Sequence, residues 1–94
     1  MTDVTGHLKQ ERMTDVIQLH IVSPEATLVD KAVSCVTLPG TLGPFEVLKD
    51  HAAIISSLVK GEIVYVAEGR EERRPVDSGF VEVRNNQVDA CVEV

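Results

Sequence analysis

Apolar and polar positions alternate over much of this chain, and the pattern is clearest in segment 16–22. Ile17, Leu19 and Ile21 fall on one face of an extended chain, and the residues between them are polar. A period of two residues is typical of a β-strand with one buried face. The pattern therefore predicts a first strand that ends at the turn-forming pair Ser23-Pro24.

Short extended segments continue to the end of the chain and are separated by turn signals at short intervals. They are 27–29, 32–38, 45–48, 53–59, 62–67, 70–74, 80–84 and the segment that begins at 87. No segment of helical length carries the i, i+3, i+4 apolar stripe of an amphipathic helix. About nine short strands predict an all-β fold, a two-sheet antiparallel β-sandwich or flattened barrel.

The pair Asn85-Asn86 suits a two-residue hairpin between the last two strands, because asparagine tolerates the left-handed backbone that a type I′ turn requires. This turn predicts a register in which Val83 faces Val88 and Phe80 faces Cys91. Alternate residues of the two strands then form the core face, namely Val81, Val83, Val88, Ala90 and Val92.

Segment 70–74 is charged throughout, and Arg70, Arg73 and Arg74 are interleaved with glutamates. We expect this segment to pair back on segment 62–67 as an edge strand, with Pro75 limiting how far the ladder runs. The mixed signs favour a solvated edge over a phosphate-binding patch.

The stretch from Leu38 to Gly43 departs from simple strand and turn patterns. Proline fixes its own φ and glycine adopts positive φ, so Pro39-Gly40 suits the centre of a type II turn. A second break follows at Gly43-Pro44, which leaves only Thr41 and Leu42 between the breaks. We predict a tight projecting tip that presents Leu42 to a partner, the alternative being that Leu42 folds inward as ordinary packing.

Length and composition limit the chain to one small domain, which we place at residues 16–94. Residues 1–15 are polar and lack an apolar period, so we expect a disordered leader. The apolar 44% consists mainly of Val, Ile, Leu and Ala, with neither a membrane-spanning run nor the apolar core of a secretion signal. We therefore expect a soluble, cytoplasmic domain. The net charge of −6 argues against nucleic-acid binding.

The two cysteines, Cys35 and Cys91, are far apart in the sequence and form no CxxC pair. We expect both to be reduced thiols in strands. Only an accident of folding would gather them with His20 and His51 into a zinc site, so no metal site is predicted.

Catalytic motifs are absent from the sequence: no Gly-rich phosphate loop, HExxH, GxSxG or EF-hand pattern occurs. Asp50, His51 and Ser56 or Ser57 supply the residue types of a nucleophilic triad, but no oxyanion element accompanies them. A corner histidine that bonds nearby backbone is the simpler reading of His51. We predict a non-catalytic chain with neither a cofactor nor a catalytic residue.

Several short motifs, taken together and in order, resemble the epsilon subunit of F-type ATP synthase. They are Val22-Ser23-Pro24-Glu25, the Leu38 to Gly43 stretch, Phe45-Glu46-Val47-Leu48, His51-Ala52, Gly61, and Ser78 to Val83. The resemblance covers about residues 18–94. It implies a β-sandwich at the foot of the central rotor stalk, beside the gamma subunit and on the c ring, which couples the two without catalysis of its own.

The resemblance also implies positions for the partner contacts. Ser23 and His51 would lie on the side facing gamma, and Leu42 and Phe45 are the apolar candidates near the tip. The residues that would reach the c ring are Gly40, Thr41, Leu42 and Gly43. Family members often have an acidic or polar residue at the position of Thr41.

Many family members continue into a helical hairpin that restrains ATP hydrolysis and in some binds ATP. This sequence has no residues for such a hairpin, so we expect no nucleotide binding. The resemblance implies peripheral attachment at the cytoplasmic face of the bacterial inner membrane, through the c ring. The alternatives are a free-standing β-sandwich module that binds a small ligand or a peptide, and a small hydrolase that uses His51.

Overall fold

The structure is a computed structural model, and it describes residues 16–94. The predicted leader, residues 1–15, lies outside the described residues. The nine strands are β1 (Ile17–Val22), β2 (Thr27–Val33), β3 (Cys35–Gly40), β4 (Gly43–Val47), β5 (Ile54–Leu58), β6 (Gly61–Ala67), β7 (Arg70–Val76), β8 (Ser78–Arg84) and β9 (Gln87–Glu93). Residues 16–94 contain no helix, so the all-β prediction is confirmed, and none of their segments is a helix that could cross a membrane.

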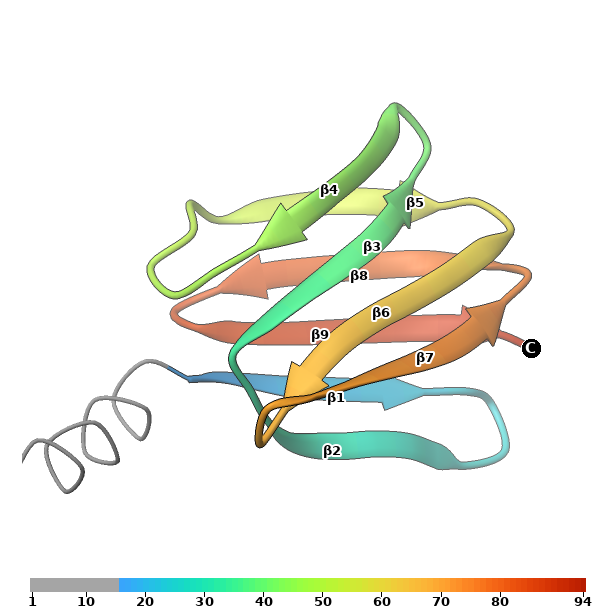
Figure 1. The fold of residues 1–94 in the computed structure, drawn as a ribbon. Coiled ribbons are helices and arrows are strands. Elements are labelled where there is room, and N and C mark those ends of the chain that lie inside the picture. The colour runs from blue at the N-terminus through green and yellow to red at the C-terminus, as the bar shows by residue number, and fades with distance from the viewer. Residues whose placement is uncertain (1–15) are drawn as a thin grey trace, which may run out of the picture.

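The strands form one curled sheet that folds into two layers (Figure 1). One layer has the order β2-β1-β9-β8-β5, and the other contains β3, β4, β6 and β7, with β3 between β4 and β6. The ladder between β3 and β5 is the single residue pair Gly40 and Leu58, so the two layers meet at one corner. Neighbouring strands are antiparallel except β1 and β9, which run parallel, contrary to the purely antiparallel prediction.

The core lies between the layers and is made almost entirely of aliphatic side chains. Burial of apolar surface is the main stabilising contribution to such a domain. The predicted inward residues of β1 are completely buried. The buried set is Ile17, Leu19, Ile21, Val29, Val33, Val36, Leu38, Val47, Leu58, Ile63, Tyr65, Ala67, Val76, Val81, Val83, Val88, Ala90 and Val92.

The β8–β9 hairpin has the predicted register. Asn85 and Asn86 have φ of 51° and 61°, the left-handed values of a type I′ turn. Val83 pairs with Val88, and Phe80 pairs with Cys91. The predicted core face of this hairpin is buried, which confirms that the turn residues set which side of each strand faces the interior.

The chain divides β2 from β3 at a different place from the one predicted. Segments 27–29 and 32–38 were expected as strands, but β2 runs on to Val33 because it pairs with β1 along its whole length. The chain then changes layer at Ser34, whose N–H donates to the Val66 carbonyl at 2.8 Å. Tertiary pairing with β1 overrides the local pattern here.

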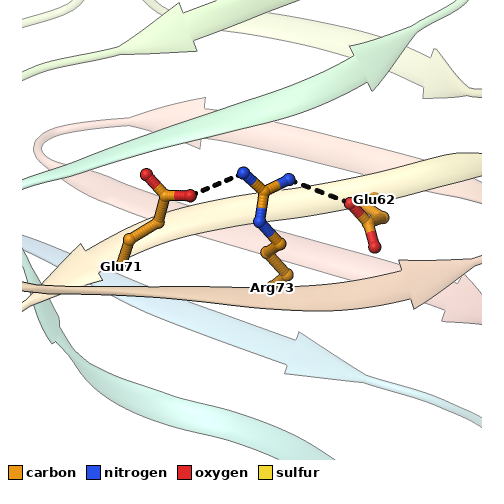
Figure 2. A network of polar contacts seen from close by, with 3 residues as sticks. All are labelled: Glu62, Glu71 and Arg73. Atoms are coloured by element: carbon orange, nitrogen blue, oxygen red, sulfur yellow. Dashed lines mark hydrogen bonds and ion pairs between the residues drawn. The ribbon is translucent and has the colours of Figure 1, made fainter.

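Strand β7 is an edge strand, as predicted, and pairs only with β6. The expectation that Pro75 limits the ladder is wrong, since pairing continues to Val76 opposite Gly61. Figure 2 shows the outward side of this edge, where the Arg73 guanidinium bonds Glu62 at 3.1 Å and Glu71 at 2.6 Å. These two carboxylates raise the pKa of Arg73.

Side chains, and not a ladder, connect the two edge strands β2 and β7. Lys31 on β2 lies 3.3 Å from the carboxylate of Glu72 on β7 and 6.0 Å from the ring centroid of Tyr65. The hydrogen bond from Tyr65, and then that from Lys31, lowers the pKa of Glu72. Burial, and then Glu72, raises the pKa of Tyr65. We call this contact between the two edges the seam.

Candidate functional site

The β3–β4 hairpin ends in a two-residue tip that projects from the domain (Figure 1). Gly40 pairs with Gly43, so the turn consists of Thr41 and Leu42. Leu42 is 103% exposed, the highest value among the exposed large apolar residues. The structure therefore presents Leu42 to solvent, and the alternative of ordinary inward packing is wrong.

The turn lies two residues later than the sequence suggested. Pro39 and Gly40, expected at the centre of a type II turn, are the last residues of β3, and Gly43-Pro44, expected as a second break, begins β4. The Pro39 carbonyl accepts from the Val59 N–H at 2.9 Å, which ties it into the structure. Gly43 has a φ of 125°, a conformation that L side chains rarely adopt.

Strand β5 braces the tip from one side. The N–H of Thr41 donates to the Ser57 carbonyl at 3.1 Å. Its hydroxyl lies 2.6 Å from the Ser57 hydroxyl and 3.2 Å from the Ser57 carbonyl. The Thr41 side chain thus positions the tip through its bonds to Ser57. Leu42 is the side chain of the tip that is free to contact a partner.

Gly40 is required by the close approach of a neighbouring ring. A Cβ at this position would lie 2.8 Å from the Gly43 carbonyl oxygen and 2.9 Å from the ring of Phe45. Phe45 pairs with Leu38 and packs partly against the core. The structure therefore gives Phe45 a packing role in addition to its predicted part in the interface.

The outer face of the five-stranded layer carries two parallel cross-strand rows of different chemistry. The row nearer the tip is mainly apolar: Ser57, Phe80, Cys91 and Val22. The next row is mainly acidic: Ile55, Glu82, Asp89, His20 and Asp30. Ile55 and Phe80 are 77% and 65% exposed. We call these the apolar row and the acidic row.

An open hollow of about 530 Å³ lies along the apolar row. Val22, Ser57, Phe80 and Cys91 line it, together with the predicted interface residue Ser23. The Ser23 hydroxyl and the backbone of Ala26 bond each other at 3.3 Å. Because Ser57 also braces the tip, the apolar row and the tip form one continuous surface.

His51 lies at the other end of the strands from Ser23. The neighbouring Asp50 bonds Asn86 in the β8–β9 turn, with its N–H 2.6 Å from the Asn86 side-chain oxygen. His51 Nδ1 lies 2.7 Å from the Ala52 carbonyl, the local backbone bond considered in the sequence reading. The structure thus does not bring Ser23 and His51 together, and a partner that touches both must span the strands from end to end.

The residue types of a nucleophilic triad do not assemble. The Asp50 carboxylate accepts from the Asn86 side-chain amide, and the His51 ring bonds backbone. The Ser57 hydroxyl lies against Thr41, and the Ser56 hydroxyl donates to the Ser57 carbonyl at 2.9 Å. None of these bonds links the histidine to a serine or to the aspartate.

The candidate zinc residues are likewise dispersed. No three His, Cys, Asp or Glu side chains gather as a metal site within residues 16–94. His20 Nδ1 lies 3.6 Å from the Asp89 carboxylate, and both cysteines are free thiols, Cys35 in β3 and Cys91 in β9. Burial, and then Glu46, raises the pKa of the Cys35 thiol.

The sequence reading missed the apolar row as a candidate interface. Part of the row could have been predicted, since the hairpin register already places Phe80 and Cys91 together on the face opposite the core. What the sequence lacked was the pairing of β8 with β5 and of β9 with β1, which adds Ser57 and Val22 to the same row.

Residues 16–94 match the family described as ATP synthase, Delta/Epsilon chain, beta-sandwich domain. A relative named ATP synthase epsilon chain from Carboxydothermus hydrogenoformans is 38% identical over 76 residues, which is 81% of this chain and 57% of the relative. Another from Campylobacter jejuni (strain RM1221) is 40% identical over 81 residues, which is 85% of this chain and 61% of the relative. The chain thus spans well under two thirds of the length of these relatives.

Solved structures share the fold. A chain of the Euglena gracilis mitochondrial ATP synthase, OSCP/F1/c-ring in rotational state 1, superposes with a TM-score of 0.77 at 22% identity, covering 82% of this chain and 50% of that chain. A chain of the Tetrahymena thermophila mitochondrial ATP synthase central stalk/c-ring gives 0.71 at 13% identity, with coverages of 83% and 63%. Because the family match extends over every described residue, this chain belongs to the ATP synthase delta/epsilon chain family, of which it carries the β-sandwich domain.

Proposed function

We propose that this chain is a non-catalytic rotor subunit of the central stalk of an F-type ATP synthase. In this role it couples the gamma subunit to the membrane c ring during proton-driven ATP synthesis. The observation that carries the proposal is the fully exposed Leu42 on a braced tip, in a domain of the epsilon family. The names of the relatives support the same subunit.

The tip is suited to a contact with the c ring. A single apolar side chain on a short, hydrogen-bonded turn loses little conformational freedom on binding, so most of its burial contributes to affinity. Gly40, Thr41 and Gly43 hold Leu42 in place, by close packing, by bonds to Ser57 and by a left-handed backbone respectively. The ring contact would attach the chain peripherally at the cytoplasmic face of the bacterial inner membrane.

The outer face of the five-stranded layer is suited to a contact with gamma. The apolar row supplies exposed anchors, of which Phe80 is the largest, and anchors of this kind dominate interface energy. The acidic row beside it would favour a partner that carries basic residues next to its apolar contact. A gamma contact that includes both Ser23 and His51 would cover this face along the full length of the strands.

The proposal is tested by recovering the affinity-tagged chain from detergent-solubilised membranes. We expect the gamma and c subunits to be recovered with it. Phe80→Asp should weaken binding to purified gamma, whereas Leu42→Asp should leave gamma binding intact and weaken recovery of the c subunits. A chain recovered with neither partner would contradict the proposal and favour a free-standing module whose ligand occupies the hollow beside Phe80.

A further inference from the structure

Arg74 is a cation that makes few hydrogen bonds to the described part of the chain. It lies on the inward-facing side of β7, opposite the buried Ile63. Within residues 16–94 its guanidinium donates one hydrogen bond, from Nη2 to the Leu28 carbonyl, and this bond is long at 3.4 Å. Its Nε is buried and has no partner in the described part of the chain.

A guanidinium has five N–H donors in a planar fork that matches a carboxylate. A buried N–H without a partner is unfavourable, and natural structures usually satisfy it with a protein group, a water molecule or an ion. The neighbouring Arg73 shows the contrast, since two carboxylates accept from it on the outer side of the same strand (Figure 2).

A second open hollow, of about 350 Å³, lies beside Arg74 at the seam. Apolar groups make up most of its lining: Leu28, Pro75, Val76 and Val94. Asp77 also lines it and would oppose a dianion such as phosphate. The chemistry that fits is therefore one negative charge on a small aliphatic body.

We propose that this hollow is a binding site for a small aliphatic monocarboxylate. The carboxylate accepts hydrogen bonds from the Arg74 guanidinium, and the aliphatic group packs against Leu28, Val76 and Val94. The site lies at the seam between β2 and β7 and shares no lining residue with the hollow beside Phe80, although Asp77 and Val94 are the chain neighbours of Ser78 and Glu93, which line that hollow.

The test is a titration of the ¹⁵N-labelled chain with isobutyrate at constant ionic strength, with chloride as the replaced anion. We expect the Arg74 side-chain Nε–H resonance and the Val76 amide to shift and saturate at millimolar concentrations. Isobutyramide, which has the same shape and no charge, should produce no such shift. Equal shifts with isobutyrate and isobutyramide, or no shift with either, would overturn the proposal.

Two variants make the assignment specific. Arg74→Gln should weaken isobutyrate binding about tenfold or more, because a charge-assisted bond is lost. Arg70→Gln makes the same charge change at an exposed position of the same strand and should leave binding unchanged. An equal loss in both variants would point to non-specific anion attraction and contradict the site. If Arg74→Gln fails to fold, Arg74→Lys provides the comparison; it keeps the charge but loses the planar fork, so we expect a smaller weakening, and unchanged binding would contradict the site.

Discussion

The hydroxyl groups of Thr41 and Ser57 lie 2.6 Å apart, across the corner at which the tip meets β5. The Thr41 oxygen also lies 3.2 Å from the Ser57 carbonyl, so the Thr41 hydroxyl can donate to the carbonyl and accept from the serine hydroxyl. Two exposed side chains thus hold a hairpin turn against a strand that is distant in sequence.

Replacing Thr41 with valine tests this bond with little change in shape. We expect Thr41→Val to lower the free energy of unfolding by about 1 kcal/mol, because a net hydrogen bond contributes about that much. Thr37→Val on β3 is the matched control, since the Thr37 side chain makes no hydrogen bond within residues 16–94, and it should have a smaller effect. Urea denaturation measures both, and equal losses would show that the valine itself is responsible.

Leu42→Asp separates the role of the tip in binding from any role in folding. Leu42 is fully exposed, so we expect its replacement to leave the melting temperature of the isolated chain unchanged. Recovery of c subunits with the chain should fall strongly, because the apolar anchor is replaced by a charge. Loss of melting temperature and of assembly together would make Leu42 a packing residue and contradict the proposed contact.

The two asparagines of the β8–β9 turn differ in their side-chain bonds to Asp50, which Asn86 both donates to and accepts from. Both have positive φ, but only the Asn86 side chain accepts a hydrogen bond from the Asp50 N–H, at 2.6 Å. We expect Asn86→Gly to destabilise the chain by about 1 kcal/mol and to increase hydrogen exchange at the Asp50 amide. Asn85→Gly relieves the same backbone strain without losing that bond, so it should be neutral or stabilising. Similar exchange at Asp50 in both variants would contradict the role of Asn86.

Glu72 should give the domain a measurable dependence on acid pH. Hydrogen bonds from Tyr65 and Lys31 lower its pKa in the folded chain, so the unfolded chain binds more protons as the pH falls through the ordinary glutamate range. The stabilisation from Glu72 is therefore present above that range and is lost as the pH falls through the lowered value.

Glu72→Gln should reduce the acid dependence of the melting temperature, because the titrating group at the seam is removed. Glu25→Gln changes the same charge in the β1–β2 loop, where Glu25 makes no ion pair within residues 16–94, and serves as the control. Identical pH profiles for the wild type and Glu72→Gln would contradict the assignment.

Local patterns were sufficient to predict the strands whose boundaries depend on local chemistry. The alternation of Ile17, Leu19 and Ile21 identified β1, and the left-handed preference of Asn85-Asn86 fixed the register of β8 and β9. Each of these signals acts over a few residues, so no knowledge of the rest of the fold was needed.

The predictions failed where pairing with another strand determines the local structure. Pairing with β1 extends β2 to Val33, and pairing with Gly43 keeps Gly40 in a strand and moves the turn to Thr41 and Leu42. The apolar row could not be predicted for the same reason, because it combines residues from four strands. The dispersal of His51, Asp50 and the two serines could likewise be learned only from the three-dimensional arrangement.

The single-pair junction between Gly40 and Leu58 has a mechanical consequence. Flanking it, Thr41 bonds the Ser57 carbonyl and Val59 bonds the Pro39 carbonyl, so the base of the tip is anchored in both layers at once. A sideways load on Leu42 is therefore shared between the two sheets, and neither can shear past the other without breaking these bonds. We therefore expect a push on the tip to turn the whole domain instead of bending the hairpin.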